Sequence, residues 1–263
     1  MTGAAPRPPG FADHFSHDSA SYAEYRPRYP AALFEWLAGL APARRLVWDV
    51  ATGSGQAASM LARHFDRVLA SDASLAQLRA RAPVPGVHYF AERAEAGALA
   101  PHRADLVTVA QAYHWLDHPR FHAEVDRVLV PGGAFAVWCY GSLEVGPDLQ
   151  ETFASFYDGT VGGFWPAERI HVELGYRHFR IPIDEVPAPP MRIDAELTLP
   201  QLLGYVRTWS AVGRYMKVNG KDPVPAFGEA LAALWGDPAT PRRMSWPLSV
   251  RGGRWLGPGS GET

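Results

Sequence analysis

A short apolar run that ends in an acidic residue and a glycine-rich turn constrains the fold of this chain most strongly. Residues 45–50 (RLVWDV) predict a buried strand, Gly53 and Gly55 interrupt the pattern, and a helical pattern (QAASMLARHF, 56–65) follows directly. Glycines at such a turn let the backbone approach a ligand closely, and a helix N-terminus favours partial negative charge. The sequence therefore predicts a binding site at the carboxyl end of the first strand of a parallel sheet.

Strand-like and helix-like patterns alternate around this turn through the first half of the chain. Further strands are predicted at 67–72, 87–92, 104–112 and 134–140, and helices at 31–40, 74–82 and 121–129. Mostly continuous apolar strands separated by helices are typical of a parallel sheet that is covered on both faces. We therefore expect an α/β fold with a doubly wound, mostly parallel sheet.

The second half has a less regular pattern. We expect helices near 148–160, 200–216 and 225–235, and strands at 191–197 and 242–251. Because no long polar linker interrupts the chain, we expect a single domain over 11–263. Its ligand-binding core would span 30–142, a mostly helical substrate-side extension 143–240, and the last strand 242–251. The ends, 1–10 and 257–263, are rich in small residues and proline and are expected to be disordered.

Composition and charge restrict the classes of partner. The 263 residues are 47% hydrophobic, and 25 Lys and Arg residues balance 27 Asp and Glu residues without a long run of one sign. A nucleic-acid partner is therefore not expected. No apolar stretch reaches the roughly 18 residues that a membrane span needs, and the first residues lack the apolar core of a signal peptide. Together with a single cysteine, Cys139, this favours a cytoplasmic protein without a membrane partner.

Two classes of cofactor fit the glycine turn. Gly53-x-Gly55-x-x-Ala58 matches a dinucleotide fingerprint, and Asp72 at the end of the second strand would accept hydrogen bonds from ribose hydroxyls in either class. Asp49 separates the classes, because its charge would repel a pyrophosphate but hold the α-ammonium group of a methionine moiety. The sign of this charge favours S-adenosylmethionine over NAD.

Five segments, in order along the chain, resemble the motifs of class I S-adenosylmethionine-dependent methyltransferases. They are VWDVATGSGQ (47–56), SDAS (71–74), AERAE (91–95), DLVTVAQAYHWLD (105–117) and VLVPGGAFAVW (128–138). In addition, YAEYRPRYP (22–30) and YVRTWSA (205–211) resemble the methyltransferase type 11 group, which includes the trans-aconitate methyltransferases. The resemblance implies a Rossmann-like, seven-stranded sheet with a helical cover from the N-terminal segment and the C-terminal half. It also implies methyl transfer from S-adenosylmethionine to a small-molecule acceptor, with carboxylic acids among the candidates.

The resemblance also assigns site residues. Asp49 and the backbone of residues 51–55 would face the methionine part of the cofactor, and Gln111 would line the sulfonium end. Asp72 would bind the ribose, and three residues would surround the adenine: Ala73, Ala94 and Glu95. A competing interpretation makes Asp72 or Ser74 the cap of the following helix.

Two positions in this assignment call for separate comment. Ala51 stands where the family pattern has a glycine, and we expect its methyl group to be tolerated if φ stays negative. Arg26 lies in a segment that could fold over the cofactor as a lid, and there it could pair with the methionine carboxylate or with an acidic acceptor.

The tripeptide Tyr113-His114-Trp115 follows the fourth strand, where a loop would face both cofactor and acceptor. His114 is the candidate catalytic residue, as a general base with a pKa near neutrality. The alternative, slightly favoured, is a histidine that orders the loop, because a carboxylate or thiolate acceptor needs no base. Tyr113 and Trp115 would either line the site or pack in the core.

Other functions have less support in the sequence. His118 and His122 have i, i+4 spacing, but no metal-binding motif accompanies them, so we expect no metal. An NAD-linked oxidoreductase and a methyltransferase-like binding protein without turnover remain as alternative functions.

Overall fold

A sheet of eight strands runs through the computed structural model, which describes residues 27–79, 81 and 83–257. The strands are β1 (Leu46–Val50), β2 (Arg67–Asp72), β3 (Val87–Ala91), β4 (Ala104–Ala110), β5 (Leu129–Tyr140), β6 (Ile183–Glu185), β7 (Met191–Leu197) and β8 (Arg242–Trp255). The α-helices are α2 (Ala31–Leu40), α3 (Gln56–Leu61), α4 (Leu75–Arg79), α5 (His118–Val128), α6 (Gln150–Ala154), α7 (Arg169–Glu173), α8 (Leu199–Arg207), α9 (Ser210–Asn219) and α10 (Val224–Trp235). Two short 3₁₀ segments, η2 (Tyr113–Trp115) and η4 (Gly162–Phe164), and a π-helical segment, η3 (Ser155–Thr160), complete the described elements.

Strands β1 to β5 are parallel, and the order of the strands reverses at β1. This strand pairs with β2 on one side and with β4 on the other, while β3 and β5 lie further out. In an open parallel sheet such a reversal leaves a crevice beyond the carboxyl ends of the strands. The predicted α/β fold is therefore confirmed, and its topology puts the expected ligand crevice at the ends of β1, β2 and β4.

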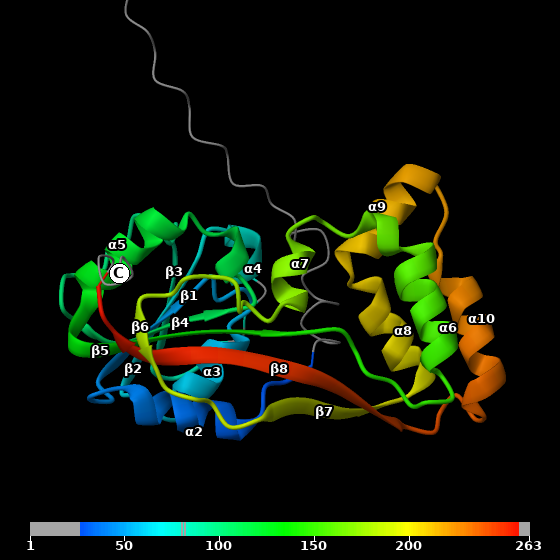
Figure 1. Ribbon diagram of the computed structural model, residues 1–263, viewed down its shortest axis with the longest axis horizontal. Helices are drawn as coiled ribbons and strands as arrows, with labels where there is room; N and C mark the ends of the chain where they lie inside the picture. Colours follow the sequence, from blue (N-terminus) through cyan, green and yellow to red (C-terminus); the bar gives the residue numbers. More distant parts are fainter. Residues whose placement is uncertain (1–26, 80, 82, 258–263) are drawn as a thin grey trace, which may run out of the picture.

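Both faces of the parallel half are covered, and adjacent residues of a strand enter different cores. In β1, Val47 packs in the core that includes α2 and α3, whereas Trp48 packs in the core that includes α5. Figure 1 shows α2 and α3 on one side of the sheet and α5 on the other. This double burial explains the continuous apolar runs, because each successive residue of a central strand is buried in one core or the other.

The sheet has eight strands rather than the seven that the family resemblance implies, because β8 has two partners on one edge. This 14-residue strand runs antiparallel to β5, and its other edge pairs with β6 near Trp255 and with β7 near Leu248. The connector 186–190 (VPAPP) spans the gap between β6 and β7, and its prolines lack the N–H groups that pairing requires. The strand expected at 242–251 accordingly continues to Trp255.

Helices from the second half of the chain form a cover beside the far ends of β7 and β8, where Figure 1 shows α6, α8, α9 and α10 together. The single helix predicted over 200–216 is wrong, since α8 and α9 are separated at Thr208 and Trp209. The Thr208 hydroxyl donates to the Tyr205 carbonyl at 2.6 Å, and Trp209 is extended at the start of α9. The break places the Trp209 ring 5.8 Å from the rings of Phe153 and Tyr205.

The segment 143–240, expected to be mostly helical, contains β6 and β7 as well as helices. The strand predicted at 191–197 is confirmed as β7. Among the described helices, none combines the length and the apolar character that crossing a bilayer requires.

We expect Gly253→Ala to lower the free energy of unfolding by about 2 kcal/mol or more. A methyl group at this position of β8 would overlap the backbone carbonyl oxygen of Asp184 in β6, and backbone cannot relax by changing rotamer. Urea denaturation measures the effect. The control is Gly141→Ala, where a methyl group would have nothing within 4 Å. Equal stabilities of the two variants would show that β6 is not held against β8 in this way.

Candidate functional site

A tight loop, residues 51–55, joins β1 to α3 at the carboxyl edge of the sheet. The Thr52 N–H donates to the Ser71 carbonyl of β2 at 2.9 Å, and the Gly55 N–H donates to the Thr52 carbonyl at 3.0 Å. The loop is thus fixed to the neighbouring strand by its own backbone. It lies at the position where the sequence predicted the binding site.

Asp49 lies near the end of β1, beneath this loop, and is 0% exposed. Its carboxylate accepts hydrogen bonds from the Thr52 hydroxyl at 2.6 Å and the Thr108 hydroxyl at 2.9 Å. Burial raises the pKa of Asp49 to about 6, although the two hydroxyl bonds act in the opposite direction. The sequence predicted a direct contact between this carboxylate and a ligand, but the structure places the two threonine hydroxyls against it. At neutral pH the loop therefore rests on a buried negative charge.

Asp72, the last residue of β2, binds the same loop from the neighbouring strand. Its Oδ2 accepts the Gly53 N–H at 2.8 Å, and its Oδ1 accepts the Ser74 N–H at 2.7 Å. The Ser74 hydroxyl in turn accepts the Gln77 N–H at 3.4 Å in the first turn of α4. Of the two residues that the sequence offered as helix caps, Ser74 takes this role, while Asp72 stays at the crevice.

The loop contains residues with left-handed backbone. Ala51 has φ of 52°, and Gly53 and Gly55 have φ of 58° and 84°. The condition set for Ala51, a negative φ, is not met, because the turn needs a left-handed residue directly after β1. Glycine adopts this conformation freely, whereas an alanine there costs roughly 1–2 kcal/mol. At Gly55 a side chain would be strained by the left-handed φ and would also have to displace the Tyr89 ring.

Gln111 follows β4 on the opposite side of the point where strand order reverses. Its φ is 58°, and its backbone N–H donates to the Trp138 carbonyl at 2.9 Å. The side-chain Nε2 is buried and has no hydrogen-bond partner among the described residues. Buried donors are nearly always paired in native proteins, and strained backbone concentrates at functional sites. Gln111 Nε2 is therefore a candidate donor for a ligand at this edge of the sheet.

The residues predicted to surround an adenine ring lie on the β2 and β3 side of the crevice. Ala73 is exposed, and Ala94 is buried at 8% exposure. The Glu95 carboxylate accepts the Asp117 N–H at 3.2 Å and lies 3.6 Å from the Arg93 guanidinium. Glu95 thus connects the loop after β3 to the segment that follows η2.

His114 lies in η2, just beyond β4, and Tyr176 holds it in place. Its Nδ1 is 2.8 Å from the hydroxyl of Tyr176, a fully buried residue. This bond orients the imidazole ring of His114 against a buried hydroxyl. Burial and the neighbouring His171 lower the pKa of His114 to about 3. Such a weak base fits the loop-ordering role better than general base catalysis.

Tyr113 is a core residue and does not line the site. It is fully buried, its ring lies 4.3 Å from that of His118, and its hydroxyl is 2.8 Å from His122 Nε2. Burial raises the pKa of Tyr113 and lowers that of His122 to about 4. The two histidines therefore serve packing around Tyr113. Within the described ranges no group of three or more His, Cys, Asp or Glu residues could hold a metal ion.

The N-terminal segment contacts the start of α3. The Pro27 carbonyl accepts a hydrogen bond from Gln56 Nε2 at 3.0 Å. Arg26, which the sequence predicted to pair with a carboxylate, lies outside the described residues.

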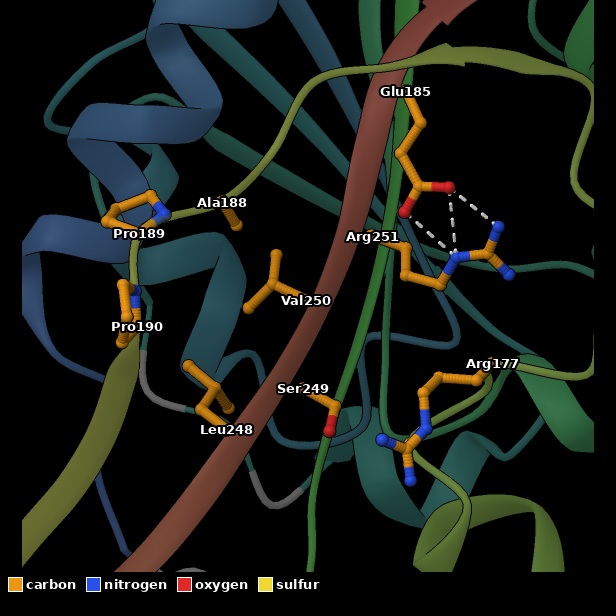
Figure 2. Close-up of a pocket in the computed structure, with 10 residues that line it drawn as sticks. Arg177, Glu185, Ala188, Pro189, Pro190, Leu248, Ser249, Val250 and Arg251 are labelled. Carbon is orange, nitrogen blue, oxygen red and sulfur yellow. Dashed lines mark hydrogen bonds and ion pairs between the residues drawn. The ribbon is translucent and has the colours of Figure 1, made fainter.

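An open pocket of about 500 Å³ lies at a different place, along the outer edge of β8 beside the connector 186–190 (Figure 2). On its polar side, Arg251 pairs with Glu185 at 2.7 Å and donates to the Tyr176 and Phe179 carbonyls. The Arg251 guanidinium therefore already has its hydrogen-bond partners within the protein. Because β5 and β8 separate this pocket from β4, we place the candidate site in the crevice at the ends of β1, β2 and β4.

Three residues that organise the site were not singled out from the sequence: Thr52, Thr108 and Tyr176. Thr108 carries a usable signal, since it is a polar residue within the apolar run LVTVA. Tyr176 carries none, because 62 positions separate it from its partner His114.

Comparisons with known proteins agree with this geometry. Residues 48–137, which span β1 to most of β5, match a family model described as a methyltransferase domain. A protein of Dictyostelium discoideum named as a methyltransferase is 30% identical over 235 residues, 88% of this chain and 89% of the relative. One of Mycobacterium tuberculosis, also named as a methyltransferase, is 36% identical over 126 residues, 47% of this chain and 51% of the relative. A solved structure from Anaeromyxobacter dehalogenans, described as a type II methyltransferase, is 43% identical with a TM-score of 0.83, covering 88% of this chain and 98% of that chain.

We expect Ala51→Gly to raise the free energy of unfolding by about 1 kcal/mol. The variant removes the left-handed strain, although part of this gain is offset by the greater freedom of glycine in the unfolded chain. Urea denaturation compares it with Ala233→Gly, an exposed position inside α10. There the same substitution should destabilise by about 1 kcal/mol. A loss of stability in both variants would contradict a left-handed Ala51.

We expect Asp49→Asn to stabilise the ligand-free protein at neutral pH by about 1–3 kcal/mol. The pKa of Asp49 is raised from 3.8 to about 6 in the folded state. The native protein therefore binds more protons than the unfolded chain between about pH 4 and pH 6, and this contribution to stability is lost as pH rises through that window. Urea denaturation at several pH values should show the advantage of the variant at about pH 7.5 and little difference near pH 4. A variant that is less stable at neutral pH would show that the charge itself supports the fold.

Proposed function

This chain belongs to the class I S-adenosylmethionine-dependent methyltransferases, and on that premise we propose that it methylates a small-molecule carboxylic acid without a strong base. That it is a methyltransferase with S-adenosylmethionine as its methyl donor follows from the family. The acceptor does not follow from the family, and the narrower resemblance to trans-aconitate methyltransferases stays a prediction. The observation that carries the proposed acceptor is the low pKa of His114 and its bond to Tyr176.

The residues of the crevice fit this donor, whose sulfonium group supplies an electrophilic methyl carbon when bound. The buried charge of Asp49 stabilises the cationic amino acid end through the loop above it, in place of the direct contact first expected. Gln111 lines the sulfonium end and offers its unpaired Nε2 to the methionine carboxylate. On the other side, Asp72 binds the ribose hydroxyls.

The remaining assignments concern the two ends of the cofactor. The exposed Ala73 packs on the adenine, with Ala94 and Glu95 at its border. The lid role predicted for Arg26 falls on a residue outside the described part of the chain. These roles are proposed from the positions of the residues in the fold, and each can be tested by a single substitution.

We infer the acceptor from the low pKa of His114, the histidine that the sequence predicted to face both cofactor and acceptor. A hydroxyl or amine acceptor must lose a proton during methyl transfer, whereas a carboxylate is already a nucleophile. Its oxygen forms a bond to the methyl carbon as the carbon–sulfur bond breaks, and the electron pair of that bond stays on sulfur. Alignment alone supplies effective molarities of roughly 10⁵ M or more, so no proton transfer is needed for rate.

The overall charge supports a small acceptor in preference to a polyanion. The formal net charge is −2, and no long cationic run occurs in the sequence. A nucleic-acid substrate would call for a basic surface to neutralise phosphates.

Equilibrium titration with S-adenosylhomocysteine and with NADH tests the cofactor half of the proposal. We expect tight binding of the first and none of the second, and weaker binding of S-adenosylhomocysteine by about 10- to 100-fold in Asp49→Asn, which loses a charge interaction. Binding of NADH instead, or an affinity unchanged in the variant, would contradict the role given to the buried charge.

We expect His114→Asn to keep kcat within about 10-fold of the wild type, because general base catalysis contributes typically 10²–10⁴-fold and none is lost here. The asparagine Oδ1 can accept the Tyr176 proton in place of Nδ1, so the loop stays ordered. His114→Ala, the comparison variant, leaves this buried hydroxyl unpaired and should lower the free energy of unfolding by about 1–3 kcal/mol. At saturating S-adenosylmethionine, kcat should show no titration between pH 6 and pH 8. A thousand-fold loss in the asparagine variant would instead identify His114 as a base.

A further inference from the structure

An arginine whose guanidinium is only partly hydrogen-bonded lies between the sheet and the helical cover. Arg169, in α7, is 21% exposed. Its Nε donates to the Tyr157 hydroxyl at 3.2 Å, and its Nη2 donates to the Ser142 hydroxyl at 3.4 Å. A carboxylate oxygen of Glu173 lies 3.5 Å from the same Nε. Within the part of the chain that the structure describes, Nη1 has no hydrogen-bond partner.

Aromatic side chains fix the orientation of this guanidinium. Its centre lies 4.9 Å from the ring centre of Trp165. The rings of Trp165, Tyr157 and Trp209 lie within 5.1–5.5 Å of one another. Since one face of the guanidinium is stacked and one edge is bonded to hydroxyls, Nη1 is held in a set direction, and little conformational freedom is lost when it binds a ligand.

The hydrogen-bond network around Arg169 is complete without Nη1. The Ser142 hydroxyl donates to the Tyr157 oxygen at 3.1 Å, and the Tyr157 hydroxyl donates to Glu173 at 3.3 Å. Every hydroxyl therefore has both a donor and an acceptor within the network. A role in holding Ser142, Tyr157 and Glu173 together explains the hydrogen bonds of Nε and Nη2. It does not explain Nη1, which takes no part in the network.

Arg169 is close to the strand ends where an acceptor approaches the donor. Ser142 lies two residues beyond β5, and the charge of Arg169 acts on both His114 after β4 and Cys139 in β5. Figure 1 shows α7 between the end of β4 and the helices of the cover. Near Arg169, the buried Nε1 of Trp165 also has no hydrogen-bond partner among the described residues. Two donors without partners thus lie beside an aromatic surface at the carboxyl edge of the sheet.

We propose that Arg169 Nη1 binds one carboxylate oxygen of the methyl acceptor, with the apolar part of the acceptor against Trp165. This inference rests on the proposed function and adds the subsite that selects an acid. Because Nη1 engages a single oxygen, the second oxygen keeps its lone pairs and forms the bond to the methyl carbon. A primary amide of the same skeleton would keep a hydrogen bond to Nη1 but lose the ion pair with the guanidinium, so the subsite binds acids more tightly than their neutral analogues.

Labelled S-adenosylmethionine and a panel of aromatic and aliphatic monocarboxylates, each paired with its primary amide, test the subsite. We expect the wild type to methylate acids and not amides. Arg169→Leu should raise KM for the best acid by about 10- to 100-fold, with a smaller change in kcat, because a hydrogen bond to a charged group is lost. Arg169→Lys keeps the charge without the planar fork and should give an intermediate KM.

A control separates this effect from a general loss of positive charge or of structure. Arg207→Leu removes an arginine of α8 that is 51% exposed and pairs with Asp222, and should leave KM unchanged. The dissociation constant of S-adenosylhomocysteine should stay the same in every variant. If Arg169→Leu loses that affinity through misfolding, the KM of Arg169→Lys tests the subsite in its place.

The outcomes distinguish failure of the subsite from failure of the proposed function. Methylation of an acid with the same KM in wild type and Arg169→Leu would overturn the subsite and leave the proposed function standing. Equal use of an acid and its amide would overturn the subsite as well. A wild-type enzyme that methylates no acid, while binding S-adenosylhomocysteine, would overturn the proposed acceptor without any variant being needed.

Discussion

The buried carboxylate of Asp49 is the interaction on which the arrangement of the crevice depends. From its position in β1, it accepts hydrogen bonds from Thr52 of the loop and from Thr108 of β4. Strands β1 and β4 are the neighbours between which the sheet reverses its order. A carboxylate that is 0% exposed pays a desolvation cost, and its pKa is raised to about 6 as a result. The protein keeps this charge although a neutral side chain would suit the interior better. The physical reason we infer is that a cationic ligand above the loop recovers the electrostatic energy that folding gives up.

Backbone strain is concentrated around the same crevice. Among the described residues, the non-glycine positions with positive φ are Ala51, Gln111 and Tyr176, together with His102 in the loop before β4. The first two directly follow β1 and β4, and Tyr176 binds His114 just beyond β4. Left-handed backbone at non-glycine residues costs of order 1–3 kcal/mol each, and it persists where surrounding contacts determine the geometry. Here those contacts are the strand ends themselves, which hold donors and turns in the positions that ligand binding needs.

Most of the parallel half could be predicted from the sequence, because its central strands β1 and β4 are buried on both faces and its helices have clear apolar patterns. The strand at 67–72 and the helix at 31–40 agree with β2 and α2 at both ends. Errors occurred where long-range packing decides the outcome. The break at Thr208 is linked to the packing of the Trp209 ring against distant aromatic residues. The pairing of β8 with a second strand depends on the length of β8. A local sequence pattern reveals neither feature. Within the site, the sequence could indicate that Asp49 lies at the end of the first strand beside the loop. Its hydrogen bonds to two hydroxyls from separate segments could not be predicted.

The division of the chain into a regular and an irregular half has a functional consequence. The donor side of the crevice is made by β1, β2 and β4, whose registers are fixed by parallel pairing and by two cores. The acceptor side depends on the segment between β5 and β6, which includes a π-helical turn around Tyr157 and the short helix that carries Arg169. Val172 and Tyr176 of this segment pack in the core of the parallel half, whereas its exposed side chains contact no strand core. Since π-helical turns are frequent at functional sites, we expect the choice of acceptor to reside there, while His114 and Tyr176 keep that segment aligned with the end of β4.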